Sequence, residues 1–327
     1  MKTISIIVEF ENATLKGLEE LTDFVAVLKR EILAAHGIAR FELLCAYPGS
    51  DALAELPQVR TTLENIQHEL ADVMAVRLIE LPNRRYYELK NEAARQATGE
   101  IIIFLDSDII IQPGWLDKLL APFDDPAVQI SAGVTGFLPE DFLSRTFALI
   151  WFFPLPNDPP ERLQKRALPA NNVAFRRSWF LNNPYPYNEG FKVSCTIHAR
   201  NVARQGVKVA RPHAVGYHHF WSDGLSFLVW RALVTGRDAD RKISSDPQAS
   251  RWRRTRAALS EWRTRLISKP RRIIRHRGKV SLPWYQVPAA IGVAWAFYTV
   301  AMVAQLGLAL GLSRSRVEYL PARFHAH

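Results

Sequence analysis

The chain has 327 residues, 48% of them hydrophobic, which is enough to bury a large core and excludes an intrinsically disordered chain. Its two cysteines, Cys45 and Cys195, exclude a disulfide framework and a cysteine-ligated zinc site. The formal charge is +10, but the segment from Arg251 to Lys279 carries twelve Lys and Arg against one acid, so the attraction for an anionic partner is local.

The first 121 residues predict strands that alternate with helices. Short apolar runs are expected to form strands at 3–8, 41–46, 76–81 and 101–105. Apolar residues at helical spacing predict helices at 15–36, 51–71, 86–98 and 115–121. None of the strands has a polar face, which is typical of a mostly parallel sheet covered by helices on both faces. The predicted fold class is therefore α/β.

The fourth predicted strand ends in two acids, Asp106 and Asp108. In open α/β sheets ligands bind beyond the carboxyl ends of the strands, and alternate residues of an extended segment point the same way. Both acids are therefore expected to face one cleft around Ser107. Carboxylate oxygens suit Mg²⁺ or Mn²⁺, which are usually shared with substrate phosphates. A solvated acidic turn is the alternative, but the buried strand before the acids favours a metal site.

Four segments of the chain resemble glycosyltransferase family 2. They are KNEAARQATGE, then ATGEIIIFLDSD with the following IIIQPGWL, then LPANNVAFRRSWF, and finally PHAVGYHHF. The resemblance covers roughly residues 3–220 and implies the GT-A fold, a Rossmann-like α/β domain. It also implies an inverting displacement, in which an acceptor oxygen attacks the sugar of a nucleotide-diphospho-sugar donor.

The resemblance implies roles for individual residues of the site. Asp106 would contact the nucleotide ribose or the metal, and Asp108 would bind the Mn²⁺ or Mg²⁺ that bridges the donor diphosphate. His218 or His219 would complete the metal site, although two adjacent histidines at a strand end are often surface residues. Lys90 stands where the family often has a basic residue near the nucleotide, and a solvent-facing helix lysine is the equal alternative.

Two departures from the family pattern concern the nucleotide. The first strand ends VEFENA, so Glu9, Phe10 and Glu11 replace the trio that usually contacts the base, although Phe10 is still able to stack on a base. The second strand ends CAYPGS, and Tyr47 stands where relatives usually carry an aspartate that reads the base. The identity of the nucleotide is therefore open.

A third departure concerns the acceptor. Relatives that glycosylate a hydroxyl carry a Glu-Asp pair whose Asp is the general base, and here those places hold Ser194 and Cys195. Glu189 lies five residues upstream of Ser194 and is the first substitute, with His198 as a weaker one.

Two explanations follow from the missing base. In the first, the acceptor is a phosphate such as a polyprenyl phosphate, which is already ionised and needs no base. A hydroxyl acceptor, by contrast, gains about 10²–10⁴ in rate from a general base. In the second, the protein has lost sugar transfer and binds a nucleotide or glycan without turnover. The intact Asp106 and Asp108 favour the first explanation.

The C-terminal third differs in composition. Residues 224–242 predict a helix from which Arg231 or Arg237 could reach the diphosphate, with a surface role as the alternative. Residues 252–268 place Trp and Leu on one helical face and arginines elsewhere, which is typical of a helix lying on anionic lipid. Nucleic-acid binding is not expected, because an apolar segment follows directly after Lys279.

Val287–Leu312 is 26 residues long and without charge, against the roughly 20 residues needed to cross a bilayer. It predicts one transmembrane or deeply inserted helix, with a buried core helix as the alternative. The basic segment before it places the N-terminal part in the cytoplasm by the positive-inside rule. The predicted domains are a GT-A domain at 1–220, a basic amphipathic linker at 221–280, a membrane helix at 281–313 and a polar tail at 314–327. The expected partners are the donor, a lipid-linked or membrane-associated acceptor and anionic membrane lipids.

Overall fold

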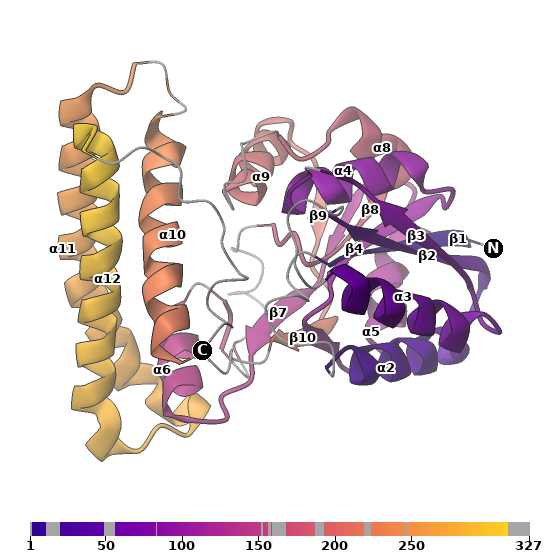
Figure 1. The fold of residues 1–327 in the computed structure, drawn as a ribbon, viewed down its shortest axis with the longest axis horizontal. Helices are drawn as coiled ribbons and strands as arrows, with labels where there is room; N and C mark the ends of the chain where they lie inside the picture. The colour runs from indigo at the N-terminus through magenta and orange to yellow at the C-terminus, as the bar shows by residue number, and fades with distance from the viewer. Residues whose placement is uncertain are drawn as a thin grey trace.

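The structure is a computed structural model that describes residues 2–10, 20–48, 56–82, 84–151, 153–155, 158, 168–186, 193–218, 224–244, 246 and 248–312. An α/β part, which begins at the N-terminus, lies beside a layer of long C-terminal helices (Figure 1). The polar tail predicted at 314–327 lies outside the described residues.

The elements follow the predicted order. The strands are β1 (Lys2–Glu9), β2 (Ile38–Tyr47), β3 (Ala75–Glu80), β4 (Ile101–Asp106), β5 (Ile109–Ile111), β6 (Ile130–Ala132), β7 (Val134–Phe137), β8 (Asn172–Arg176), β9 (Val209–Ala210) and β10 (Val215–His218). The helices are α2 (Glu20–Ala34), α3 (Leu56–Leu70), α4 (Tyr86–Gln96), α5 (Trp115–Leu120), α6 (Phe142–Ile150), α8 (Arg177–Asn182), α9 (Ser194–Arg204), α10 (Leu225–Ser244), α11 (Arg251–His276) and α12 (Val287–Leu310). Three short 3-10 turns are η2 (Ala121–Asp124), η3 (Arg277–Val280) and η4 (Trp284–Gln286).

The main sheet has the strand order β3-β2-β1-β4-β8-β6-β9. The strands β3, β2, β1 and β4 are parallel to one another, as predicted, because each connection between them carries a helix across the sheet. Strand β8 runs antiparallel to both β4 and β6, which makes the sheet mixed. Helices α4 and α8 cover one face, and α2, α3 and α5 cover the other (Figure 1). All six residues of β4 are buried, which explains its unbroken apolar run.

A second sheet of three strands, β5-β10-β7, was not predicted from the sequence. Strand β10 pairs antiparallel with β5 and parallel with β7, so His218 lies opposite both Ile109 and Phe137. Because Asp108 immediately precedes Ile109, this pairing brings His218 next to the acids that follow β4.

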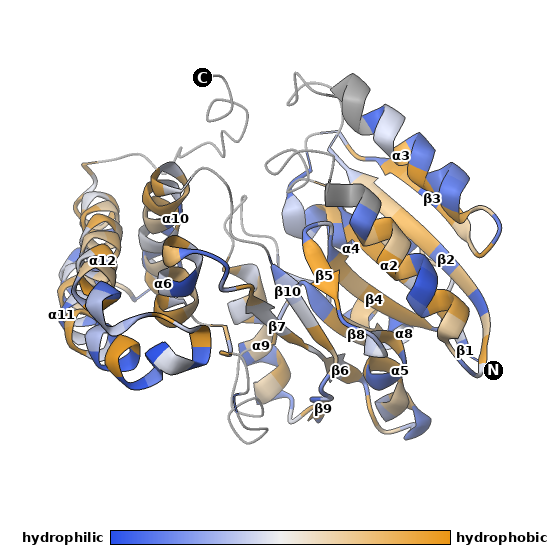
Figure 2. Ribbon diagram, turned by 90° about the horizontal axis from the view of Figure 1, so that it is seen from below, coloured by the Kyte–Doolittle hydropathy of each residue, from blue (hydrophilic) through white to orange (hydrophobic). Residues whose placement is uncertain are grey.

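The helical layer is formed by α10, α11 and α12, which share an apolar core with α6. Helices α10 and α12 approach closely where Gly236 meets Ala301. A Cβ on Gly236 would overlap the Ala301 carbonyl, so this approach requires glycine at position 236. Figure 2 shows the contrast in hydropathy between the largely apolar α12 and the mixed surface of α11. In the part of the chain that the structure describes, Trp284–Leu310 is the one helix long and apolar enough to cross a membrane, a test of length and composition only.

Candidate active site

Asp106 is held by two side chains of α4. Residues 86, 90, 93 and 94 are buried against the sheet, and this spacing turns one face of the helix toward the end of β4. Lys90 Nζ lies 2.6 Å from Asp106 Oδ1 and donates a second hydrogen bond, of 2.9 Å, to the carbonyl of Ala170. The Tyr86 hydroxyl donates to the same carboxylate, 2.7 Å from Oδ1 and 2.9 Å from Oδ2. Burial and the nearby Asp106 carboxylate raise the pKa of Tyr86 well above its usual value, so the hydroxyl remains a donor.

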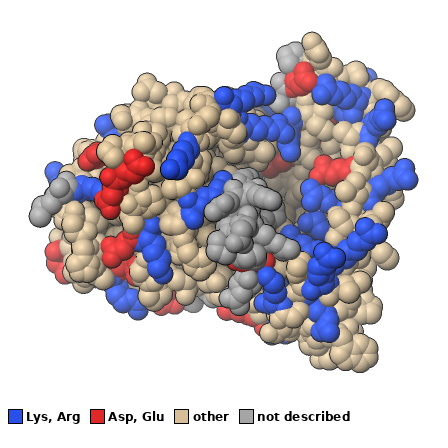
Figure 3. All heavy atoms as spheres, turned by 180° about the vertical axis from the view of Figure 1, so that it is seen from behind, with Lys and Arg blue, Asp and Glu red and all other residues tan. Residues whose placement is uncertain are grey.

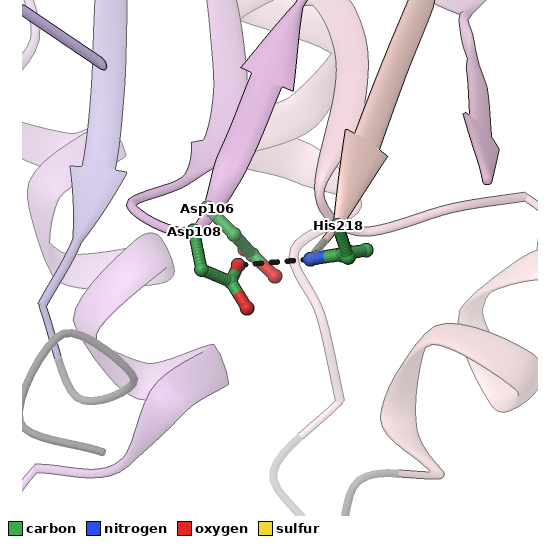
Figure 4. A group of neighbouring side chains, drawn as sticks. All are labelled: Asp106, Asp108 and His218. Atoms are coloured by element: carbon green, nitrogen blue, oxygen red, sulfur yellow. Dashed lines mark ion pairs between the residues drawn. The ribbon is translucent and has the colours of Figure 1, made fainter. Parts of the chain in front are cut away.

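Asp108 faces His218, whose Nδ1 lies 3.1 Å from its Oδ1 (Figure 4). Asn171 orients the imidazole of His218. The Asn171 carbonyl oxygen accepts from the Thr135 hydroxyl, 3.3 Å away, and its amide nitrogen lies 2.8 Å from His218 Nε2. The donor and acceptor of this contact depend on the tautomer of the ring, and in either case the contact holds the imidazole in one orientation, with Nδ1 toward Asp108. The ring of Phe153 stacks on the imidazole, with centroids 5.7 Å apart and an interplanar angle of 13°.

Asp106, Asp108 and His218 form a buried cluster in which one ligand atom from each residue lies within 4.8 Å of the others. Two carboxylates and an imidazole are ligands that Mn²⁺ accepts, and carboxylates suit Mg²⁺ as well. The donor set therefore fits a divalent metal.

The wall beside His218 is fixed by the helical layer. Lys269 of α11 and Tyr298 of α12 both donate to the carbonyl of Ile150, at 2.5 and 2.7 Å. Arg272 of α11 donates to the carbonyl of Phe153 at 3.1 Å. These donors satisfy carbonyl groups at and just beyond the C-terminus of α6, where cations are favourable. Burial, with the neighbouring Arg265 and Arg272 adding to it, lowers the pKa of Lys269 to about 7.

A cavity of about 690 Å³ extends from the cluster to the helical layer. Asp106, Asp108 and His218 line one side, and side chains of α10, α11 and α12 line the other. Its basic lining residues are Arg211, Arg231, Lys242, Arg265 and Lys269. Its aromatic lining includes Phe147, Trp151, Phe227, Trp230, Trp262 and Tyr298. The cavity therefore combines anion-binding side chains with an apolar wall.

Residues 61–181 match the sequence profile described as "Glycosyl transferase family 2". The matched segment contains α4, β4 and both acids, so the profile and the geometry agree on the same site. Over this segment, which is a little more than a third of the chain, the sequence is similar to glycosyltransferase family 2.

One curated relative is similar in sequence. The O-antigen biosynthesis protein RfbC of Myxococcus xanthus is 26% identical over 179 residues. The match covers 54% of this chain but 13% of that protein, so the chain spans about one eighth of the curated relative's length.

A solved glycosyltransferase shares the fold. The mannosyltransferase PcManGT from Pyrobaculum calidifontis, in complex with GDP-Man and Mn²⁺, aligns with a TM-score of 0.51 at 16% identity. That alignment covers 95% of this chain and 81% of that chain, and it shows a common GT-A-like fold. Glucosyl-3-phosphoglycerate synthase from Mycobacterium tuberculosis aligns with a TM-score of 0.46 at 17% identity, over 74% of this chain and 79% of that one.

Of the predicted nucleotide-binding residues, Asp106 lines the cavity, whereas Phe10, Tyr47 and Lys90 do not. Phe10 and Tyr47 are buried, with Tyr47 donating to Glu80 at 3.3 Å, and neither lines the cavity. Lys90 is fully buried beneath Asp106, so it acts on that carboxylate from behind. Glu11 lies outside the described residues.

The family's base position lies at the start of α9. Ser194 is buried, whereas Cys195 lines the cavity, and burial raises the pKa of the Cys195 thiol. His198 is buried against the Asn183 carbonyl, and burial lowers its pKa to about 4. Glu189 and His219 lie outside the described residues.

Sequence reasoning missed Tyr86, Asn171 and Asp238. Tyr86 orients Asp106, and Asn171 orients His218. The two asparagines at 171–172, inside an apolar segment, were a signal for buried polar contacts. Asp238 of α10 lines the cavity and raises the pKa of Cys195 through its charge, which places a carboxylate near the family's base position. No local pattern distinguished Asp238 from the other charged residues of α10.

Proposed function

We propose that the protein is a metal-dependent, inverting glycosyltransferase that moves a sugar from a nucleotide-diphospho-sugar to a membrane-associated acceptor. The acceptor is a polyprenyl phosphate or a lipid-linked glycan. The observation that carries this proposal is the single cavity that joins the Asp106–Asp108–His218 cluster to the helical layer. A donor diphosphate and an amphiphilic acceptor would meet in such a cavity.

Three residues of the cluster would bind and orient the donor. Asp108 and His218 would hold Mn²⁺ or Mg²⁺, and Asp106 would contact the cation or the ribose. When bound, the metal would neutralise charge on the leaving diphosphate. Lys90 and Tyr86 keep Asp106 in one orientation, and Asn171 keeps the His218 ring in place.

The lining of the cavity supports a phosphate acceptor. The family's base position holds Ser194 and Cys195, and neither side chain is a carboxylate. A phosphate oxygen needs no deprotonation before it attacks, so the loss of the base costs nothing there. Arg231 and Arg265 line the same cavity as the cluster and would attract the acceptor phosphate.

A hydroxyl acceptor is the second candidate, and the position of Asp238 favours it. Asp238 lies near Cys195 at the cavity wall and is a carboxylate that could accept the acceptor proton. Glu189, the earlier candidate base, would play the same role. A third reading, a silent nucleotide- or glycan-binding protein, follows from the replaced base position alone.

We place the protein at the membrane with its catalytic domain facing the cytoplasm. The long apolar α12 and the basic α11 before it support this location. The same features favour anionic lipids over nucleic acid as the partner of the basic segment.

The test is release of nucleoside diphosphate by the purified full chain with Mn²⁺. UDP-, GDP- and dTDP-sugars are offered with and without a polyprenyl phosphate, and Asp108→Ala is the control. Release that requires both the lipid phosphate and Asp108 supports the proposal. Metal-dependent nucleotide binding without release from any donor, with either a phosphate or a glycan acceptor, supports the silent protein.

A further inference from the structure

Helix α11 lies antiparallel along α12, and three hydrogen bonds fix their register. Near one end, Arg254 Nη2 donates to the carbonyl of Leu308 at 3.0 Å. At the centre, Trp262 Nε1 donates to the Thr299 hydroxyl at 3.1 Å, and Trp295 Nε1 donates to the carbonyl of Leu266 at 3.1 Å. Thr299 lies close to the middle of Val287–Leu310, so the middle of α11 lies beside the middle of α12.

This register conflicts with α12 crossing a bilayer. Glu261 and Arg263 flank Trp262 and are exposed, so a spanning α12 would carry both charges at the centre of the hydrocarbon. A charged side chain at the centre of a bilayer costs at least about 2.5–3.5 kcal/mol on insertion scales. Further exposed arginines follow along the whole of α11, at positions 251, 253, 256, 271 and 275. A spanning α12 would carry these charges across the bilayer as well.

The outer surfaces of the two helices nevertheless carry one stripe of exposed apolar side chains each, which on α11 is interrupted by Arg256 and Arg263. On α12, Trp295 is 49% exposed, Val303 60% and Leu310 47%, at helical spacing. On α11, Leu259, Ile267 and Ile274 are exposed seven or eight residues apart. The hydrogen bond from Trp295 to Leu266 joins the helices at this surface. Large apolar side chains exposed in such rows are typical of a surface that binds a partner.

The charges around these stripes indicate which partner. Figure 3 shows Lys and Arg side chains spread along the helical layer, at the right of the view. Arginine side chains are long enough to keep their guanidinium groups at lipid phosphates while their stems cover apolar surface. Trp252, Trp284 and Tyr285 are 73%, 74% and 64% exposed at the ends of the two helices, and Trp and Tyr favour the membrane–water interface.

We propose that α11 and α12 lie together in the plane of an anionic membrane surface, with their apolar stripes in one leaflet and without crossing it. The exposed arginines then lie at the level of the lipid phosphates, where each contributes binding. Both ends of α12 lie on the cytoplasmic side. This seating replaces the transmembrane helix predicted from composition, and it holds whatever sugar or acceptor the cavity takes.

A labelling experiment separates the two arrangements. Tyr285→Cys and Leu312→Cys place thiols at opposite ends of α12, at positions that are 64% and 80% exposed. The full-length variants are expressed in cells, and sealed inside-out and right-side-out membrane vesicles receive a membrane-impermeant maleimide. In-plane seating predicts that both positions react in inside-out vesicles and neither in right-side-out vesicles. Opposite accessibility of the two positions overturns the proposal. The wild-type chain measures the background from Cys45 and Cys195.

A binding experiment tests the apolar stripe and the arginines directly. Purified full-length protein is mixed with vesicles of phosphatidylcholine alone or with phosphatidylglycerol added. We expect binding that needs the anionic lipid, a loss of about fivefold for Arg263→Gln, and at least as large a loss for Val303→Asp. Leu33→Asp is the matched control, because Leu33 is 67% exposed on α2 and far from the helical layer. The proposal is overturned if Val303→Asp binds vesicles as well as the wild type does. It is also overturned if the wild type is a dimer that Val303→Asp dissociates and neither the wild type nor the variant binds vesicles.

Discussion

The ammonium group of Lys90 lies 2.6 Å from Asp106 Oδ1, and both side chains are buried. The two acids that follow β4 therefore differ in their surroundings. Asp106 is neutralised by a lysine beneath it, whereas Asp108 faces a histidine at the edge of the cavity. Asp106 is thus held in place by the fold, and a donor or cation would meet a carboxylate that is already oriented.

Replacing Lys90 tests how strongly the fold depends on this pair. Lys90→Met leaves a buried carboxylate without its partner, and we expect a loss of about 3–5 kcal/mol in the free energy of unfolding. Urea denaturation of the full chain measures it. Lys118→Met, at an exposed position, is the control and should change stability by less than about 0.5 kcal/mol. A loss below about 1 kcal/mol for Lys90→Met would contradict the role given to Lys90.

Metal binding should depend on His218 and on the residue that orients it. We expect His218→Ala to lower Mn²⁺ affinity at least about tenfold, and Asn171→Ala to lower it by about 10–100-fold, because orienting partners of ligands have that effect. Titration of Mn²⁺ by electron paramagnetic resonance measures both without needing a substrate. His213→Ala, on an exposed histidine close by in sequence, is the matched control. Equal affinities for all variants would remove His218 from the site.

Acid should destabilise the protein partly through His198. Its pKa is lowered by burial to about 4 in the folded protein, against about 6.5 in the unfolded chain. The unfolded chain therefore binds the proton first, and stability falls as pH drops from about 6.5 to about 4, by about 3 kcal/mol in total from this group. The stability of His198→Gln should fall less over that window, so the advantage of the wild type shrinks on acidification. Parallel stability curves for the two proteins would show that His198 is not the responsible group.

Replacing two candidate base carboxylates, Asp238 and Glu189, tests whether the acceptor is a phosphate or a hydroxyl. If the acceptor is a phosphate, Asp238→Asn and Glu189→Gln should each keep transfer within about threefold of the wild type, because no base is needed. If it is a hydroxyl, the variant that removes the base should lose about 10²–10⁴ in rate. Single-turnover transfer to a polyprenyl phosphate and to a lipid-linked glycan distinguishes the two, with Glu261→Gln as a control on a second acid of the cavity wall.

Apart from the short β5, the order of strands and helices through residue 120 could be predicted because each element carries its own periodicity. The buried strand that ends in Asp106 could be recognised in the same way. The approach of His218 to Asp108 was expected only from the family resemblance, which left His218 and His219 open, because the contact depends on pairing between β10 and β5, more than a hundred residues apart in sequence. The burial of Lys90 was equally hidden, because a lysine on a helix reads as a surface residue until its partner is known.

The helical layer was predicted in its elements but not in its arrangement. Apolar composition alone predicted a transmembrane or deeply inserted helix at 287–312. The neighbours of α12 are set by tertiary packing, in which Trp262 and Trp295 fix α11 beside it. Composition describes a helix in isolation, and the charges that an adjacent helix brings to its surface are absent from that description.

The carbonyl groups at and beyond the end of α6 receive their donors from Lys269, Arg272 and Tyr298 of the helical layer. A shortened protein that stops after β10, the obvious choice for a soluble preparation, would lose all three donors together with one side of the cavity. Phe153, which stacks on His218, would then lack the hydrogen bond that fixes its backbone. Biochemists who trim the apolar C-terminus to ease purification would therefore disturb the candidate metal site, and detergent or nanodisc preparations of the whole chain are the sounder starting material.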